Sequence, residues 1–174
     1  MSRARAVNWR EEKLARHHDR AGFDCGVPAL NEYLRKYARR NVESGGARTF
    51  VAVAPDAPNL ILGYYTISPG AIAFAKAPAK ISKALGRYEV PVYRLGRLAV
   101  ALDLQGRGLG ADLLYAAGER ALAVAQEVGG VALAIDAKDK RAASWYERFG
   151  APRLIDDPLK LILPLETIRS TQTQ

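Results

Sequence analysis

A strand-like segment that runs into a glycine-rich turn and then into a long helix constrains this chain more than any other feature. Residues 97–111 read RLAVALDLQGRGLGA, an apolar run followed by Gly106, Gly108 and Gly110. Glycine allows backbone angles and a close approach that a Cβ would block. Such a turn leaves backbone N–H groups pointing outward, and the positive end of the helix dipole adds to them. The segment therefore predicts a binding site for a pyrophosphate.

The turn has three other interpretations. A P-loop is excluded because no Gly-Lys-Ser/Thr follows. A dinucleotide site requires glycines spaced GxGxxG, whereas here they read GxGxG, although Asp136 ends the next strand-like run at a suitable distance. An ordinary strand–helix turn without a ligand is the remaining alternative.

Length and composition indicate one globular domain over residues 1–174, with flexible ends at residues 1–8 and 169–174. No apolar run approaches the roughly 20 residues that span a bilayer, and no signal-peptide core opens the chain. The single cysteine, Cys25, cannot form an internal disulfide. We therefore expect a cytoplasmic protein without a membrane segment. No metal site is expected, because His17 and His18 have no further His or Cys cluster.

Positive charge is concentrated in two stretches. The net charge is +8, with 11 basic and 6 acidic residues in 1–50 and 7 basic and 2 acidic residues in 76–107. A polyanionic partner such as nucleic acid explains this distribution, and so does a solvated basic surface.

The order of elements predicts an α/β (α+β) fold, a mixed sheet with helices on both faces. The first helix is expected to begin at 27–30. Its apolar residues recur at helical spacing and so form one face, made of Leu30, Tyr33, Leu34, Tyr37 and Ala38. Gly45-Gly46 ends that helix, and Asp139 caps a later one. The remaining expected elements are strands at 9–16, 49–54, 60–67, 92–102, 131–135 and 159–163, and helices near 79–85, after 109 and at 140–149.

Specific motifs resemble the GNAT N-acetyltransferases. Gln105, Gly108 and Gly110 meet their Gln/Arg-x-x-Gly-x-Gly/Ala pattern, and SWYERFG follows at 144–150. From about residue 10 to 165 the chain looks like the GNAT toxins of type II toxin–antitoxin systems. The segments that carry this resemblance are FDCG (23–26), ALN (29–31), RTFV (48–51), GYY (63–65), RLAV (97–100), GRGLGADLL (106–114) and WYERFG (145–150).

The resemblance implies a GNAT fold, with a mixed, mostly antiparallel central sheet flanked by helices, and acetyl-CoA as cosubstrate without a metal. It implies that Tyr146 protonates the departing thiolate, although a core aromatic beside Trp145 is the alternative. Arg107 is either a diphosphate contact or a solvated loop residue. The expected acetyl-CoA contacts are Leu98, Ala99, Val100, Gln105, Gly106, Arg107, Gly108, Leu109, Gly110 and Ser144.

The strand before the glycine turn, residues 92–98, carries no carboxylate that could act as a general base, although Glu89 is close in sequence. A lysine amine with a pKa of about 10.4 is neutral in about one molecule in 2,500 at pH 7, whereas an α-amine near 7.7 is neutral in about one in six. The sequence therefore favours an acceptor of low pKa.

The toxin family acetylates the α-amino group of aminoacyl-tRNA and so blocks translation. The resemblance implies that activity here, together with a homodimer and a neutralising ribbon-helix-helix antitoxin. A protein N-terminus or a small amine is the alternative acceptor. Candidate tRNA phosphate contacts, each of which could instead be a solvated charge, are Arg35, Lys36, Arg39, Arg40, Arg87, Arg94 and Arg97.

Overall fold

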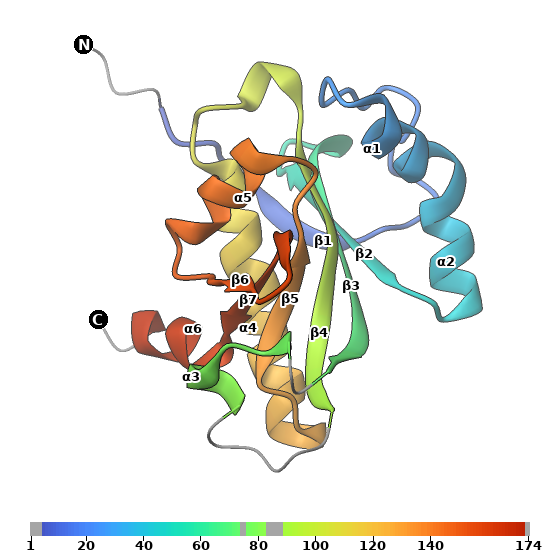
Figure 1. Ribbon diagram of the computed structural model, residues 1–174. Helices are drawn as coiled ribbons and strands as arrows, with labels where there is room; N and C mark the ends of the chain where they lie inside the picture. The colour runs from blue at the N-terminus through green and yellow to red at the C-terminus, as the bar shows by residue number, and fades with distance from the viewer. Residues whose placement is uncertain (1–4, 74–75, 83–88, 173–174) are drawn as a thin grey trace. The chain divides into compact units, whose positions relative to one another are not determined.

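The computed structural model describes residues 5–73, 76–82 and 89–172 (Figure 1). The chain forms two compact units. Unit 1 comprises residues 1–67 and 97–116, and unit 2 comprises residues 68–96 and 117–174. Two strands and one long helix pass from one unit into the other, so each unit is built from two separate stretches of chain. The expected Arg87 contact lies outside the described residues.

Unit 1 contains an antiparallel meander at its N-terminal end. Strand β1 (Arg10–Lys13) pairs with β2 (Arg48–Ala54), and β2 pairs with the start of β3 (Ala57–Ile72). The strands predicted at 49–54 and 60–67 form a hairpin, whose loop is only Pro55-Asp56 because Ala54 already faces Ala57. Strand β1 is shorter than the predicted strand at 9–16.

The helical segment of unit 1 changes its geometry along its length. Helix α1 (Pro28–Glu32) runs into a π-helical turn, η1 (Tyr33–Tyr37), and then into α2 (Ala38–Ser44), which Gly45 ends in the left-handed conformation. A π-helical turn takes more residues than an α-helical one, so it shifts the face that later residues present. Tyr37 is consequently 46% exposed. The prediction that Tyr37 belongs to the apolar face was wrong, whereas Tyr33, Leu34 and Ala38 are buried as expected.

Unit 2 holds the first part of β4 (Val90–Val100) together with β5 (Ala132–Asp136), β6 (Arg153–Leu154) and β7 (Asp157–Pro164). The pair β4–β5 is parallel, and β5–β7 and β6–β7 are antiparallel. The hydrogen-bonded order of the strands is β1-β2-β3-β4-β5-β7-β6. The prediction of a mixed, mostly antiparallel sheet is confirmed.

Helices follow the strands closely. Leu102–Leu104 form a single 3₁₀ turn, η3, after β4, and α4 (Leu109–Val128) begins in unit 1 and ends in unit 2. Unit 2 also contains α3 (Ala79–Ser82), α5 (Lys140–Glu147) and α6 (Leu165–Gln172). The Asp139 carboxylate accepts a hydrogen bond from the Ala142 N–H, which confirms the predicted cap of α5. Helix α6 runs through Gln172, in contrast to the flexible end expected from residue 169.

Each unit has its own apolar core. In unit 1, Tyr64 of β3 lies beneath the helical segment, and its ring packs against Phe23 and Tyr33. In unit 2, Ala77 and Ile81 pack onto strand residues that include Val92 and Ile162. Among the described helices, none is both long enough and apolar enough to cross a membrane.

Candidate functional site

The glycine-rich turn between η3 and α4 presents an uninterrupted row of free donors. In the described part of the chain, no acceptor is found for the backbone N–H groups of residues 106–111. The first helical bond of α4 comes only at Asp112, whose N–H donates to the Gly108 carbonyl. Six N–H groups at the positive end of a 20-residue helix form a cradle for phosphate oxygens. We call this segment, residues 106–111, the anion cradle.

Two glycines give the cradle its shape. Gly106 and Gly108 have φ values of 77° and 89°, a backbone conformation that residues with a Cβ rarely adopt. A Cβ built on either residue would meet nothing within 4 Å, so the space beside the turn is open. Glycine is therefore required here by the backbone conformation, and the space beside the turn is open to a ligand.

The Gln105 side chain ties the residue before the cradle to the neighbouring backbone. Its side-chain amide donates to the carbonyls of Cys25 and Val100, both at 2.9 Å. A second tie runs from the Leu102 N–H to the Asp24 carbonyl, also at 2.9 Å. Both N–H groups of the Gln105 amide are thus engaged within the protein. The sequence motif predicts that Gln105 contacts the ligand. In the structure its side chain instead hydrogen-bonds to two backbone carbonyls of the protein.

Arg107 is held at the edge of the cradle. Its Nε and Nη2 donate to the Arg5 carbonyl at 3.1 and 2.9 Å. A neutral carbonyl orients the guanidinium but does not cancel its charge, as a carboxylate would. Among the described residues, Nη1 has no partner. The side chain is therefore fixed in place and remains cationic.

The end of β4 extends beyond its ladder with β5. The parallel ladder with β5 ends at Leu95 and Ile135, whereas β4 itself continues to Val100. Leu98, Ala99 and Val100 thus lie beyond the last β5 pair, with Ala99 buried and its neighbours half-buried. The Val100 carbonyl already accepts from the Gln105 amide, and the remaining backbone groups on the edge that β5 leaves can meet an extended ligand such as a pantetheine chain.

Tyr146 lies on α5 in unit 2. Only 7% of it is exposed, and its ring packs edge-on against Trp145, which in turn contacts Phe149. Burial raises the pKa of the Tyr146 phenol above its ordinary value. The described residues offer its hydroxyl no hydrogen-bond partner. Tyr146 therefore keeps its proton well above neutral pH and is not committed to a structural bond.

Ser144 precedes Tyr146 on the same helix but has a partner. Its exposed hydroxyl accepts a long hydrogen bond, 3.5 Å, from Nη2 of Arg153. That arginine also binds Glu147 and the Pro158 carbonyl. Ser144 thus lies within a small polar network at the end of α5.

The structure divides the basic side chains of the helical segment into two classes. Lys36 pairs with Glu32 at 3.0 Å, and Arg39 pairs with Glu43 at 3.5 Å. Arg35 and Arg40 are exposed, and no described carboxylate lies within ion-pair distance of either. These two arginines can meet a phosphate without first breaking an ion pair.

Arg97 stacks on an aromatic ring. Its guanidinium carbon lies 3.6 Å from the centroid of the Tyr33 ring. The Tyr33 hydroxyl accepts a hydrogen bond from the Asn41 amide, which fixes the ring. Sequence reasoning placed Arg97 among phosphate contacts and missed this platform, because nothing in the sequence pairs residue 33 with residue 97.

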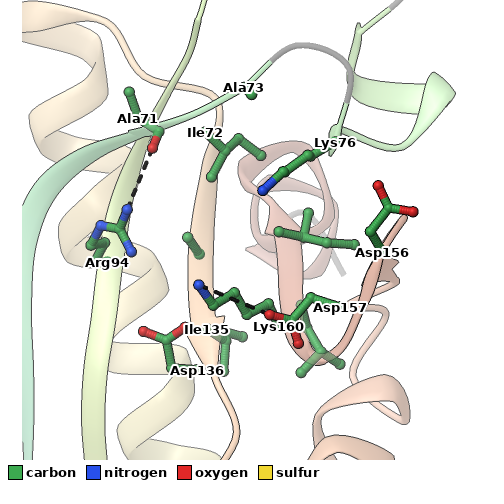
Figure 2. Close-up of a pocket in the computed structure, with 13 residues that line it drawn as sticks. Ala71, Ile72, Ala73, Lys76, Arg94, Ile135, Asp136, Asp156, Asp157 and Lys160 are labelled. Carbon is green, nitrogen blue, oxygen red and sulfur yellow. Dashed lines mark hydrogen bonds and ion pairs between the residues drawn. The ribbon is translucent and has the colours of Figure 1, made fainter.

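Arg94 lines a pocket of unit 2 with a volume of about 240 Å³ (Figure 2). Its Nη2 donates to the Ala71 carbonyl at 3.4 Å. Lys160 lies in the pocket with its Nζ 4.0 Å from a carboxylate oxygen of Asp157, and Figure 2 shows Lys76 and Asp156 on another side of the pocket. Sequence reasoning did not predict this pocket, because its lining comes from five strands, β3, β4, β5, β6 and β7, and from the segments that follow β3 and β6. Glu89, the nearby carboxylate considered as a base, is exposed.

Glu12, His17 and His18 lie as close together as the ligands of a metal site, and His18 is held by two hydrogen bonds within the protein. His18 is buried, its Nδ1 accepts the Ala15 N–H at 2.9 Å, and its Nε2 lies 2.9 Å from Glu12. With Nδ1 accepting, the neutral ring carries its proton on Nε2 and donates it to the carboxylate, and this bond lowers the pKa of Glu12. A cation at Nε2 would displace that proton. The sequence did not foresee that His18 is a buried, hydrogen-bonded residue.

Comparison with known proteins gives a consistent match. Residues 12–151 match the Acetyltransferase (GNAT) family. The chain is 36% identical over 152 residues to a tRNA-acetylating toxin of Mycobacterium tuberculosis, an alignment that covers 87% of this chain and 89% of the relative.

Two solved structures show the same fold. One is AtaT complexed with acetyl-methionyl-tRNAfMet, with a TM-score of 0.88 and 27% identity, over 95% of this chain and 99% of that one. The other is a tyrosine-to-phenylalanine variant of AtaT bound to the C-terminus of the antitoxin AtaR and acetyl-CoA. It has a TM-score of 0.83 and 26% identity, over 97% of this chain and all of that one.

Proposed function

This chain belongs to the GNAT family of acetyltransferases, and we propose that it transfers the acetyl group of acetyl-CoA to the α-amino group of aminoacyl-tRNA and so blocks translation. The observation that carries the proposal is the anion cradle, whose six free N–H groups and open side suit the diphosphate of acetyl-CoA. The similarity to a tRNA-acetylating toxin and to AtaT bound to an acetylated tRNA supports the acceptor.

Each proposed contact follows from the chemistry of its group. The cradle backbone from Gly106 to Gly110, including Leu109, holds the diphosphate, and Arg107 adds a positive charge. The edge of β4 at residues 98–100, beyond the β5 ladder, holds the pantetheine, with the Gln105 amide bound to the Val100 carbonyl. Ser144 of α5 is a further proposed contact of acetyl-CoA.

Bound acetyl-CoA supplies an activated thioester. The neutral acceptor amine forms the new C–N bond at the carbonyl carbon while the C–S bond breaks. Tyr146 donates its phenolic proton to the departing sulfur, and the proton of the acylated nitrogen passes to water. Because the described residues offer the Tyr146 hydroxyl no other hydrogen-bond partner, it can turn to the departing sulfur.

The acceptor is chosen by charge as well as by reactivity. An α-amine with a pKa near 7.7 is neutral in about one molecule in six at pH 7 and needs no strong base. Arg35 and Arg40 contact phosphates of the tRNA, joined by Arg97 on its Tyr33 platform and by Arg94 at the pocket of unit 2. Lys36, Arg39 and Arg87, the last outside the described residues, are the further proposed phosphate contacts.

The proposed activity implies a cellular location and binding partners for this chain. Charged tRNA is the substrate, so the reaction belongs in the cytoplasm. A cell that carries such an enzyme needs an inhibitor, and AtaT is seen with its antitoxin AtaR. We propose a ribbon-helix-helix antitoxin as the inhibitor and a homodimer as the active assembly of this chain.

The deciding experiment is transfer of radiolabelled acetyl from acetyl-CoA to total aminoacyl-tRNA. Deacylated tRNA and a lysine-rich protein serve as controls. Label on charged tRNA alone is the expected result, and sequencing the labelled pool then identifies the amino acid. Label on protein or on a small amine, with none on tRNA, would overturn the proposed acceptor and leave a GNAT enzyme of another specificity.

A further inference from the structure

The segment just before β1 lies along the start of α4. Two contacts fix it there: the Arg5 carbonyl accepts the two hydrogen bonds from Arg107, and the Trp9 indole N–H donates to the Asp112 carboxylate at 3.2 Å. The contacts join residues more than 100 positions apart in sequence. We call residues 5–9 the N-terminal strap.

The strap meets the cradle at two places. From Arg5 to Trp9 is four residues, and their partners, Arg107 and Asp112, lie within the cradle and directly after it. Strand β1 begins at Arg10 and is paired with β2, so the far end of the strap is anchored in the sheet of unit 1. The C-terminal end of the strap is therefore held by β1, and its other end reaches the edge of the cradle.

The two contacts have complementary electrostatic effects. The Arg5 carbonyl takes both N–H groups on one side of the Arg107 guanidinium and leaves its charge intact. The Trp9 indole engages the Asp112 carboxylate, an anion in the first turn of α4 that would otherwise face an incoming phosphate freely. Both effects favour an anion in the cradle.

We propose that the N-terminal strap is a positioning element for acetyl-CoA, which aims Arg107 at the diphosphate and restrains Asp112. The proposal rests on the proposed function only in taking acetyl-CoA as the ligand of the cradle. Arg5 and Trp9 act through Arg107 and Asp112, and do not touch the reacting atoms.

The first test uses the full chain and CoA, which binds without turnover. Trp9→Phe removes the indole donor and keeps an aromatic ring, and titration calorimetry should show CoA affinity about threefold weaker. A chain lacking residues 2–7 removes the Arg5 carbonyl and should bind about tenfold more weakly, the equivalent of about 1.4 kcal/mol. Acetylpantetheine, which lacks the diphosphate, should bind equally to all of these proteins.

A double-mutant cycle then separates positioning from simple stabilisation. In an Arg107→Gln background, removal of residues 2–7 should cause no further loss of CoA affinity, because the strap has nothing left to aim. In steady-state assays the truncation should raise KM for acetyl-CoA and leave kcat unchanged. Additive losses in the cycle, or an equal loss for acetylpantetheine, would overturn the proposal. CoA binding is measured without tRNA, so failure of the proposed acceptor would leave this outcome unaffected.

Discussion

The Arg97 guanidinium carbon lies 3.6 Å from the centroid of the Tyr33 ring, so the end of β4 is joined to the π-helical turn by a cation over an aromatic face. Replacing Arg97 with Met keeps the packing of the side-chain stem and removes the charge. We expect Arg97→Met to lower the free energy of unfolding by about 0.5–2 kcal/mol, measured in urea. Arg97→Lys should recover part of that loss, and no change in either variant would show that the stacking contributes nothing.

Gly108 tests the cradle directly. Gly108→Asp places a side chain and a negative charge where the diphosphate is proposed to bind, and CoA affinity should fall by at least about 100-fold in calorimetry. Gly45 supplies a matched control. It ends α2 with a φ of 77°, and a Cβ there also meets nothing within 4 Å. Gly45→Asp should carry a similar backbone strain and bind CoA normally. Normal binding by Gly108→Asp would mean that the cradle holds no diphosphate.

Tyr146→Phe tests the proposed acid. Loss of the phenolic proton should lower kcat about 100-fold, while the calorimetric affinity for CoA stays within about twofold. Tyr115→Phe, at a half-buried tyrosine of α4, is the control and should leave kcat unchanged. An unaltered kcat in Tyr146→Phe would remove Tyr146 from the reaction.

The profile of kcat/KM against pH should rise and then level off, without a fall at high pH. Burial raises the pKa of Tyr146, so its protonated, donating form persists at higher pH than for a free phenol. The acceptor α-amine loses its proton near pH 7.7, so kcat/KM should rise tenfold per pH unit below about 7 and level off above about 8. Initial rates from pH 6 to 9 suffice, and a fall between pH 8 and 9 would contradict a phenol with a raised pKa.

Salt dependence distinguishes the two classes of basic side chain. A cation that contacts one phosphate changes the slope of log affinity against log salt by about 0.7 to 0.9. Arg35→Gln and Arg40→Gln should each flatten the slope for tRNA by about that amount. Lys36→Gln is the comparison, because Lys36 is already paired with Glu32 and should change the slope less. Equal slopes for all four proteins would make these charges a solvated surface.

The sequence predicted the elements whose signals are local. The glycine turn, the Asp139 cap and the strand–turn–helix around residues 97–111 each depend on neighbouring residues, and the structure has them where expected. The two-residue strand β6 has too few residues to show a periodic pattern, and the apolar positions of α6 are too few to mark a helix. Both were missed for that reason.

Long-range contacts account for what the sequence left open. Whether Arg107 is solvated or held depends on Arg5, and Arg97 depends on Tyr33. The exposure of Tyr37 depends on a π-helical turn, which no residue type in the segment predicts. Neither spacing nor composition encodes these pairings, because they arise when segments distant in sequence pack together.

The Gln105 amide has one more consequence. It joins the carbonyls of Cys25 and Val100, and the Leu102 N–H binds Asp24 beside it, so segments near residues 25 and 102 share their hydrogen bonds. Neither segment can open without breaking the ties to the other. Their backbone amides should exchange with solvent deuterium as one cooperative unit, at a common rate, although some 80 residues of chain separate them.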